Sequence, residues 1–335
     1  MTKVAPLKVA PLIMDREALV ARFGECEANE GTHEYTAMKD GWKIHRETWT
    51  PGGAAKAVIL FCHGDGESTR TIGMRRLAAA CLKRGFILET FDTNGHGESL
   101  EKNGQPLLAK KWRGVTIEKT SVKIDHLIEI AELVIKKHGL PLVIAGHSGG
   151  GLTCCLATDR VIELCEANGV PFVTGLYLSP GLEALRSQAP CGLACCRCCV
   201  GCCWLGCCCN CCGKPCLPVG GDYNPEDALG EDNTFKYLHL GQLLMNTKVY
   251  PDGPADVPQA AERMTKLKDG LAFIGSKDEN IKVPVVERLG TAVPGLQVEV
   301  KEGLKHDYLN MNKPGETASN TTIDYLLGIV DAKLP

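Results

Sequence analysis

The chain has 335 residues, 44% hydrophobic and 23% charged, which is enough to bury a large core as one big α/β domain or two small ones. Its net charge of -3 and its lack of a Lys/Arg-rich run provide no positive field for nucleic acid, so we expect no nucleic-acid partner. Residues 1–20 lack the continuous apolar segment of a signal peptide, and Thr2 stands where N-myristoylation needs glycine, so we expect a cytoplasmic protein.

The hydrophobic pattern predicts strands and helices in alternation. Asp40-Gly41 is a strong hairpin signal, and Gly85 and Gly139 are expected to end helices. In chain order, we expect a hairpin over 32–38 and 42–50, a strand over 57–62, a helix over 72–84, a strand over 86–91, a helix over 121–138, and strands over 143–147, 171–179, 271–275 and 296–300. Apolar strands separated by amphipathic helices indicate a mostly parallel sheet covered on both faces.

A glycine-flanked serine follows the strand that starts at Val143. In Gly146-His147-Ser148-Gly149-Gly150 the chain turns sharply from this strand into a helix, and glycines leave room for such a turn. The turn exposes the serine hydroxyl, and the free N–H groups of the helix that follows point to the same place. Ser148 is therefore the candidate nucleophile.

Acyl transfer by a serine also needs a base, an acid that orients the base, and N–H donors for the oxyanion. Asp278 follows the strand at 271–275, and His306 follows the strand at 296–300, which gives the order Ser, Asp, His. The candidate oxyanion donors are the backbone N–H groups of Asp65 and Gly149.

Several nearby residues have other interpretations. Glu279 and Asp307 are rival acids to Asp278 because they lie in the same two loops. Three further histidines follow strands earlier in the chain, and we interpret them as structural because the base of this architecture comes from the last strand's loop. They are His63, His96 and His147. Asp92 is interpreted as a loop residue.

Six short motifs resemble those of monoacylglycerol lipases and lysophospholipases of the α/β-hydrolase superfamily. They are His63-Gly64-Asp65-Gly66-Glu67-Ser68, Gly95-His96-Gly97-Glu98-Ser99, Gly146-His147-Ser148-Gly149-Gly150, Leu178-Ser179-Pro180, Gly275-Ser276-Lys277-Asp278, and Glu302-Gly303 with His306. The resemblance covers residues 41–329 and implies an α/β-hydrolase fold with an eight-stranded sheet and helices on both faces. It further implies that Ser148, Asp278 and His306 hydrolyse carboxylic esters of lipid-like acyl chains with no metal or organic cofactor. Gly149 departs from the family, which usually has methionine there.

A long segment interrupts the alternation of strands and helices. We expect residues 1–30 to form an N-terminal arm, residues 31–180 and 259–335 to form the two parts of the hydrolase core, and residues 181–258 to form a Cys-rich cap. An insertion that follows a strand of an open sheet lies over the site at the strand ends. The cap is therefore expected to lie over Ser148.

The chain has 19 cysteines, of which thirteen fall between Cys191 and Cys216. We interpret the other six as small buried hydrophobic residues. For the dense segment, a disulfide knot disagrees with a reducing cytoplasm, and a membrane span would separate Ser148 from Asp278 and His306. Binding of zinc or copper lacks the paired spacing of a structural zinc site, so S-acylation at a membrane surface fits best. The candidate S-acylation sites are Cys195, Cys196, Cys198, Cys199, Cys202, Cys203, Cys207, Cys208, Cys209, Cys211 and Cys212.

Two classes of function remain. The favoured one is a serine hydrolase of monoacylglycerols or lysophospholipids, peripheral at a membrane through its cap, with acyl-protein thioesters or small esters as alternative substrates. The other is a membrane-associated or metal-binding interaction protein on an inactive hydrolase scaffold. An inactive scaffold is expected to have lost one of Ser148, Asp278 and His306, and all three are present.

Overall fold

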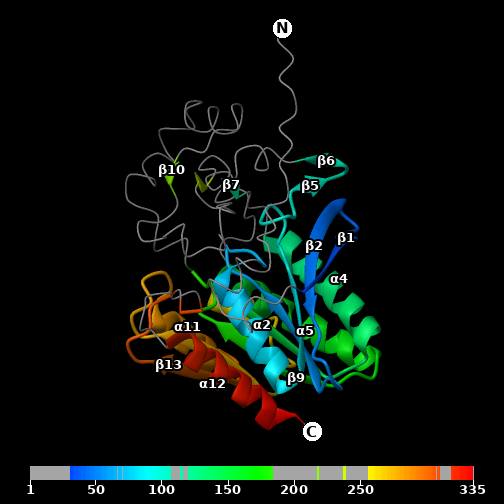
Figure 1. The fold of residues 1–335 in the computed structure, drawn as a ribbon. Coiled ribbons are helices and arrows are strands. Elements are labelled where there is room, and N and C mark those ends of the chain that lie inside the picture. The colour runs from blue at the N-terminus through cyan, green and yellow to red at the C-terminus, as the bar shows by residue number, and fades with distance from the viewer. Residues whose placement is uncertain are drawn as a thin grey trace.

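A computed structural model describes residues 31–65, 67–69, 71–106, 114–115, 120–183, 217–218, 237–238, 256–306, 308–309 and 318–334. In this part of the chain a central sheet has helices on both faces (Figure 1). The N-terminal arm and most of the predicted cap, including the dense cysteine segment, lie outside these residues, as do Asp307 and Cys26.

The central sheet contains the eight strands that the sequence predicts. They are β1 (Thr32–Ala37), β2 (Trp42–Trp49), β3 (Ala57–Cys62), β4 (Phe86–Phe91), β8 (Leu142–His147), β9 (Phe172–Leu178), β12 (Gly270–Gly275) and β13 (Leu296–Lys301). Two short strands, β5 (Glu101–Lys102) and β6 (Gln105–Pro106), extend it to ten strands among the described residues. The order is β13-β12-β9-β8-β3-β4-β2-β5-β6, with β1 paired to β2.

Strand direction follows the pattern of burial. From β4 through β3, β8, β9 and β12 to β13 every neighbouring pair is parallel, and β3, β4, β8 and β12 are buried along their whole length. The hairpin β1–β2 is antiparallel, as is the pairing of β2 with β4. A parallel strand that is buried on both faces has a nearly continuous apolar sequence, and this is why these strands could be predicted from the sequence.

Helices cover the two faces of the sheet unequally. The helices are α2 (Ile72–Arg84), α4 (Thr120–His138), α5 (Gly149–Ala167), α10 (Val257–Ala261), α11 (Val283–Ala292) and α12 (Ala318–Lys333). Core side chains of α4, α5, α10 and α11 form one hydrophobic cluster, and those of α2 and α12 form another. In Figure 1, α2 and α12 lie in front of the sheet and α4 lies on the opposite side.

Strand β3 shows how one apolar run supplies both clusters. Its side chains alternate, so Val58, Leu60 and Cys62 belong to the cluster of α4 and α5. Ala57, Ile59 and Phe61 belong to the cluster of α2 and α12. The sheet is therefore fixed from both sides at the strand that leads into the His63-Gly64 loop.

The predicted helix ends and turns are confirmed. Helix α2 spans residues 72–84 as expected and ends at Gly85, which has φ 79° and donates its N–H to the carbonyl groups of Cys81 and Leu82. Gly41 in the first hairpin has φ 89°. Five of the six cysteines outside the dense segment are described, and all five are free and buried, as predicted.

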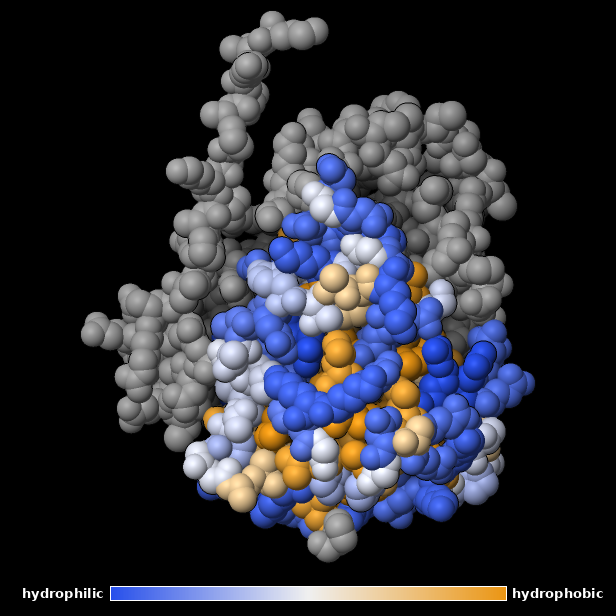
Figure 2. Space-filling view, turned by 90° about the vertical axis from the view of Figure 1, so that its right-hand side faces the viewer, coloured by the Kyte–Doolittle hydropathy of each residue, from blue (hydrophilic) through white to orange (hydrophobic). Residues whose placement is uncertain are grey.

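The surface of the described residues is mainly polar on the face shown in Figure 2, where hydrophobic side chains are visible between hydrophilic ones. Leu133 of α4, which is 39% exposed, is among the few large apolar side chains that reach solvent. In the part of the chain that the structure describes, no helix has both the length and the hydropathy that crossing a bilayer requires.

Candidate active site

Ser148 lies at the junction of β8 and α5 in a strained backbone conformation. Its φ and ψ are 52° and -119°, outside the region that residues with a side chain favour. The turn is closed by a hydrogen bond from the Ser148 N–H to the Leu178 carbonyl, 2.9 Å long. A Cβ atom on Gly146 would lie 2.5 Å from the Gly150 carbonyl oxygen. A Cβ atom on Gly150 would lie 2.1 Å from the Cys62 carbonyl oxygen. The glycines on both sides of Ser148 are therefore required by close backbone approach.

A chain of hydrogen bonds joins Ser148, His306 and Asp278. The His306 Nε2 atom is 3.0 Å from the Ser148 Oγ atom. On the other side of the ring, Nδ1 is 2.9 Å and 3.0 Å from the two carboxylate oxygens of Asp278. Because a carboxylate only accepts, Nδ1 carries the proton and Nε2 is left to accept one from the serine hydroxyl.

Asp278 is held in place from its own loop. The backbone N–H groups of Asn280 and Ile281 donate to its Oδ1 atom over 2.9 Å and 2.8 Å. Burial raises its pKa, but the hydrogen bond and charge of His306 and the Ile281 N–H outweigh that effect and hold the pKa below its usual value. Asp278 is therefore the carboxylate that contacts His306 at neutral pH, in preference to its neighbour Glu279.

His147 connects three segments of the site. Its Nδ1 is 3.0 Å from the Glu67 Oε1 atom, and its Nε2 is 3.0 Å from the backbone carbonyl oxygen of His306. The other Glu67 oxygen accepts the N–H of Gly64 over 2.6 Å. The loop after β3, the turn at Ser148 and the loop that carries His306 thus share one partly buried pair of side chains. Sequence reasoning placed Glu67 in a motif but gave it no role.

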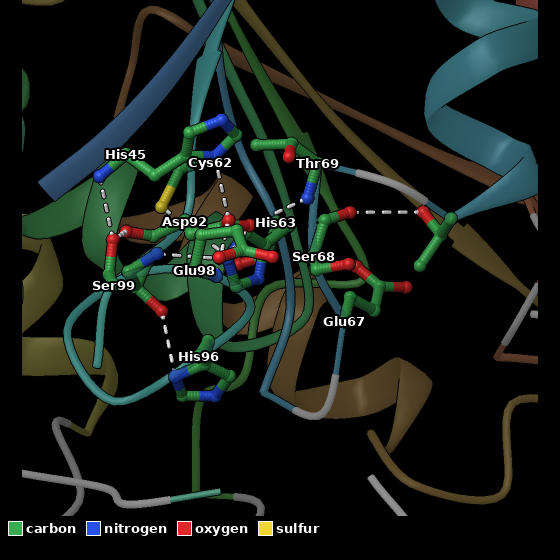
Figure 3. Close-up of polar contacts among 12 residues, drawn as sticks. His45, Cys62, His63, Glu67, Ser68, Thr69, Asp92, His96, Glu98 and Ser99 are labelled. Atoms are coloured by element: carbon green, nitrogen blue, oxygen red, sulfur yellow. Dashed lines mark hydrogen bonds and ion pairs between the residues drawn. The ribbon is translucent and has the colours of Figure 1, made fainter. Parts of the chain in front are cut away.

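Asp92 is the centre of a second buried network, shown in Figure 3. Its carboxylate accepts the N–H groups of Thr69 and Glu98 and a hydrogen bond from the His45 ring, at 2.8 Å, 2.9 Å and 2.9 Å. It lies 4.0 Å from the His63 ring. The interpretation of Asp92 as an ordinary loop residue was incomplete, because it ties the loop after β4 to the loop after β3.

His63 and His96 are buried and neutral. The Nδ1–H of His63 donates to the Gly64 carbonyl over 2.7 Å, and its Nε2 accepts the N–H of Thr93 over 2.9 Å. Burial lowers the pKa of His63, and burial together with the charge of Lys123 lowers that of His96 to about 3. Both hydrogen bonds of the His63 ring are with the backbone of loop residues, which agrees with a structural role.

The two candidate oxyanion donors lie on segments that touch. A Cβ atom on Gly64 would be 3.0 Å from Ser148 Cβ, and one on Gly149 would be 2.6 Å from a carboxylate oxygen of Asp65. The backbone N–H groups of Asp65 and Gly149 donate to none of the residues that the structure describes. Gly149 is also the first residue of α5, where the helix dipole favours negative charge.

The described ranges contain no cluster of three His, Cys, Asp or Glu side chains arranged to hold a metal ion. The candidate S-acylation sites, Cys195 to Cys212, are outside those ranges, so their role stays a prediction from the sequence.

Residues 53–168 match the family described as serine aminopeptidase, S33. Among solved structures, the chain is similar to a soluble variant of monoglyceride lipase from Saccharomyces cerevisiae, with 16% identity, a TM-score of 0.61, and coverage of 92% of this chain and 97% of that one. It is also similar to Est1E from Butyrivibrio proteoclasticus, with 14% identity, a TM-score of 0.56, and coverage of 90% and 100%. A third similar structure is an esterase from Pyrococcus furiosus, with 15% identity, a TM-score of 0.53, and coverage of 91% and 92%.

These similarities and the strand order define the class of protein: the chain has the α/β-hydrolase fold. The turn at Ser148, the loop with Asp278 and the loop with His306 follow β8, β12 and β13 within it.

The Glu67–His147 pair predicts a specific pH dependence of stability. Burial raises the pKa of Glu67, but the charge and hydrogen bond of His147 and the Gly64 N–H lower it to about 2. A lowered carboxyl pKa stabilises the fold above the unfolded value of about 4.5, and this contribution is lost as the pH falls from about 4.5 to about 2. Glu67→Gln should lower the free energy of unfolding by about 2–3 kcal/mol at pH 7 and by much less near pH 2.5.

Urea denaturation of the wild type, Glu67→Gln and the control Glu279→Gln at pH 7, 4.5 and 2.5 measures this difference. A difference in the free energy of unfolding between wild type and Glu67→Gln that stays constant over the three pH values would contradict the lowered pKa of Glu67.

Proposed function

We propose that the chain is a serine hydrolase that cleaves carboxylic esters of lipid-like substrates, either monoacylglycerols or lysophospholipids. The hydrogen-bond chain from Ser148 through His306 to Asp278 is the observation that carries this proposal. The similarity of the fold to a monoglyceride lipase supports the lipid-like substrate class.

The proposed reaction proceeds through an acyl-enzyme. The Ser148 Oγ atom attacks the ester carbonyl carbon while its proton passes to the His306 Nε2 atom, and the carbonyl oxygen becomes an oxyanion. The backbone N–H groups of Asp65 and Gly149 stabilise this charge. His306 then returns the proton to the leaving alcohol as the C–O bond breaks. Water, deprotonated by His306, cleaves the acyl-enzyme and regenerates the serine.

Asp278 has two effects on this cycle. Its hydrogen bonds to Nδ1 keep the His306 ring in the tautomer whose Nε2 faces Ser148. Its negative charge stabilises the imidazolium that forms during each proton transfer. Its pKa, which the hydrogen bond and charge of His306 hold below the usual value, keeps this charge in place at neutral pH.

We also propose that the protein is held at a membrane surface through S-acylation of the cysteines between Cys195 and Cys212. The nearly uncharged, cysteine-dense sequence is the basis for this proposal. Because a single acyl chain binds a bilayer only marginally, a cluster that carries two or more chains would give stable attachment. The protein would then be cytoplasmic and peripheral, with its ester substrates supplied from the bilayer.

A fluorophosphonate probe tests the nucleophile. It should label the wild-type protein covalently at Ser148, and Ser148→Ala should abolish both labelling and ester hydrolysis while leaving the fold intact. Labelling is read by mass spectrometry of the modified peptide, and hydrolysis is measured on a monoacylglycerol, a lysophospholipid, an acyl thioester and a short soluble ester.

Full hydrolytic activity of Ser148→Ala would contradict the proposal that Ser148 is the nucleophile. A wild-type protein that is folded but neither labelled nor active would favour the alternative of an inactive scaffold that binds a partner or a metal. Preference for the thioester or the short ester would move the substrate class within the same reaction type.

Replacement of the orienting acid should have a separate effect. Asp278→Asn should leave the fold intact and lower turnover by on the order of 10³ to 10⁴, because the amide no longer fixes the tautomer of His306. The matched control is Glu279→Gln in the same loop, which should retain turnover. A large loss in Glu279→Gln with none in Asp278→Asn would exchange the two roles.

Replacement of the eleven candidate cysteines by serine tests the membrane proposal. The variant should move from the membrane fraction to the soluble fraction, lose activity on membrane-presented lipid, and retain hydrolysis of a short soluble ester. Stoichiometric zinc or copper in the purified protein, with no hydroxylamine-sensitive acyl groups, would decide for the metal-binding interpretation instead.

A further inference from the structure

A partly buried ion pair lies beside the candidate oxyanion donors. Lys123, in the first turn of α4, donates from its ammonium group to the Oδ1 atom of Asp65. The Lys123 side chain is only 6% exposed, whereas that of Asp65 is 40% exposed. Asp65 is also the residue whose backbone N–H is a candidate oxyanion donor. The pair therefore connects helix α4 to the oxyanion loop.

The Asp65 carboxylate lies directly against Gly149. A Cβ atom on Gly149 would be 2.6 Å and 2.9 Å from the two carboxylate oxygens and 2.7 Å from the carbon between them. The carboxylate cannot move aside freely, because Lys123 holds it. A side chain at position 149 would therefore require the Asp65 carboxylate to shift from its place beside Lys123. The glycine and the aspartate thus fit one another.

The charge of this carboxylate matters for an oxyanion. Burial raises the pKa of Asp65, but the charge of Lys123 outweighs this and lowers it below its usual value, so the carboxylate is ionised. A negative charge next to the two N–H donors would oppose the negative oxygen that forms during ester cleavage. The Lys123 ammonium cancels that charge. The His96 ring lies 3.9 Å from the Asp65 carboxylate, but it is neutral and adds no positive charge there.

We propose that Lys123 is a positioning residue which, through Asp65, fixes the oxyanion-binding peptide and neutralises the carboxylate beside it. Lys123 itself does not touch the reacting atoms. Gly149 provides the space that the Asp65 carboxylate occupies. This inference rests on the proposed serine hydrolase function, because it concerns the stabilisation of the oxyanion in that reaction.

A double-mutant cycle separates positioning from simple support of the fold. Lys123→Met leaves an uncompensated carboxylate beside the oxyanion, so kcat should fall by about 10²-fold while KM changes little. Asp65→Asn keeps the backbone N–H and removes the charge, so its loss of kcat should be smaller. In the Asp65→Asn background, Lys123→Met should lower kcat by less than about threefold, because no charge remains to be cancelled.

The rate of fluorophosphonate labelling of Ser148 is the second readout, because phosphonylation also places an oxygen between the same N–H groups. It should fall in Lys123→Met in parallel with kcat and recover in the double variant. The matched control is Lys136→Met, the same substitution in the same helix at a lysine that is 59% exposed and paired with Glu132. This control should retain the wild-type rates.

Asp65→Glu provides a test that does not remove either charge. The longer side chain keeps the pairing with Lys123 but shifts the peptide, so kcat should fall at least tenfold in a protein whose thermal unfolding is unchanged. This variant decides the question if Lys123→Met does not fold.

The outcomes separate the inference from the function on which it rests. A folded wild-type protein that is neither labelled nor active contradicts the serine hydrolase function itself. An active wild type with unchanged kcat in Lys123→Met or in Asp65→Glu overturns the positioning role. Equal losses for Lys123→Met in the wild-type and Asp65→Asn backgrounds would likewise overturn it, since the loss would then not depend on the carboxylate.

Discussion

The tight turn at Ser148 is the constraint on which the site depends. A backbone with φ 52° at a residue that has a side chain costs about 1–3 kcal/mol, and it persists because packing leaves no alternative. The carbonyl of Cys62 occupies the space next to Gly150, and the Leu178 carbonyl holds the Ser148 N–H. Strands β3 and β9, the neighbours of β8 on either side, therefore impose the turn. The packing of the sheet thus holds the Ser148 hydroxyl group in a fixed position.

The loops around the serine depend on buried charges rather than on regular structure. Glu67 and His147 join the loop after β3 to the backbone of His306, and Asp92 joins that same loop to the loop after β4. Such pairs stabilise only when each hydrogen-bonding group has its partner, because a buried charge left alone is strongly unfavourable. The conformations of these loops are consequently coupled. The hydrogen bonds among Ser148, His306 and Asp278 lie at the centre of these loops.

The sequence predicted the strands, the helices and the three hydrogen-bonded residues because each has a local signal. Apolar runs mark the buried strands, glycines mark the turn at Ser148, and Asp278 and His306 directly follow two strands of a parallel sheet. The supporting network had no such signal. The contacts of Asp65 with Lys123, of Glu67 with His147 and of Asp92 with His45 join residues 58, 80 and 47 positions apart. Periodicity reports on neighbours within one element and carries no information on these contacts.

The junction between β9 and β12 also bears on how this fold can vary. These strands are adjacent and in register, with Gly175 opposite Gly270 and Leu178 opposite Phe273, although the chain between them is long. The entropy lost on closing such a connection grows only with the logarithm of its length. Segments of very different length and composition could therefore be exchanged at this junction at little cost in stability. Asp278 after β12 would keep its distance from Ser148 after β8, so the hydrogen bonds that join these residues through His306 would not depend on the exchanged segment.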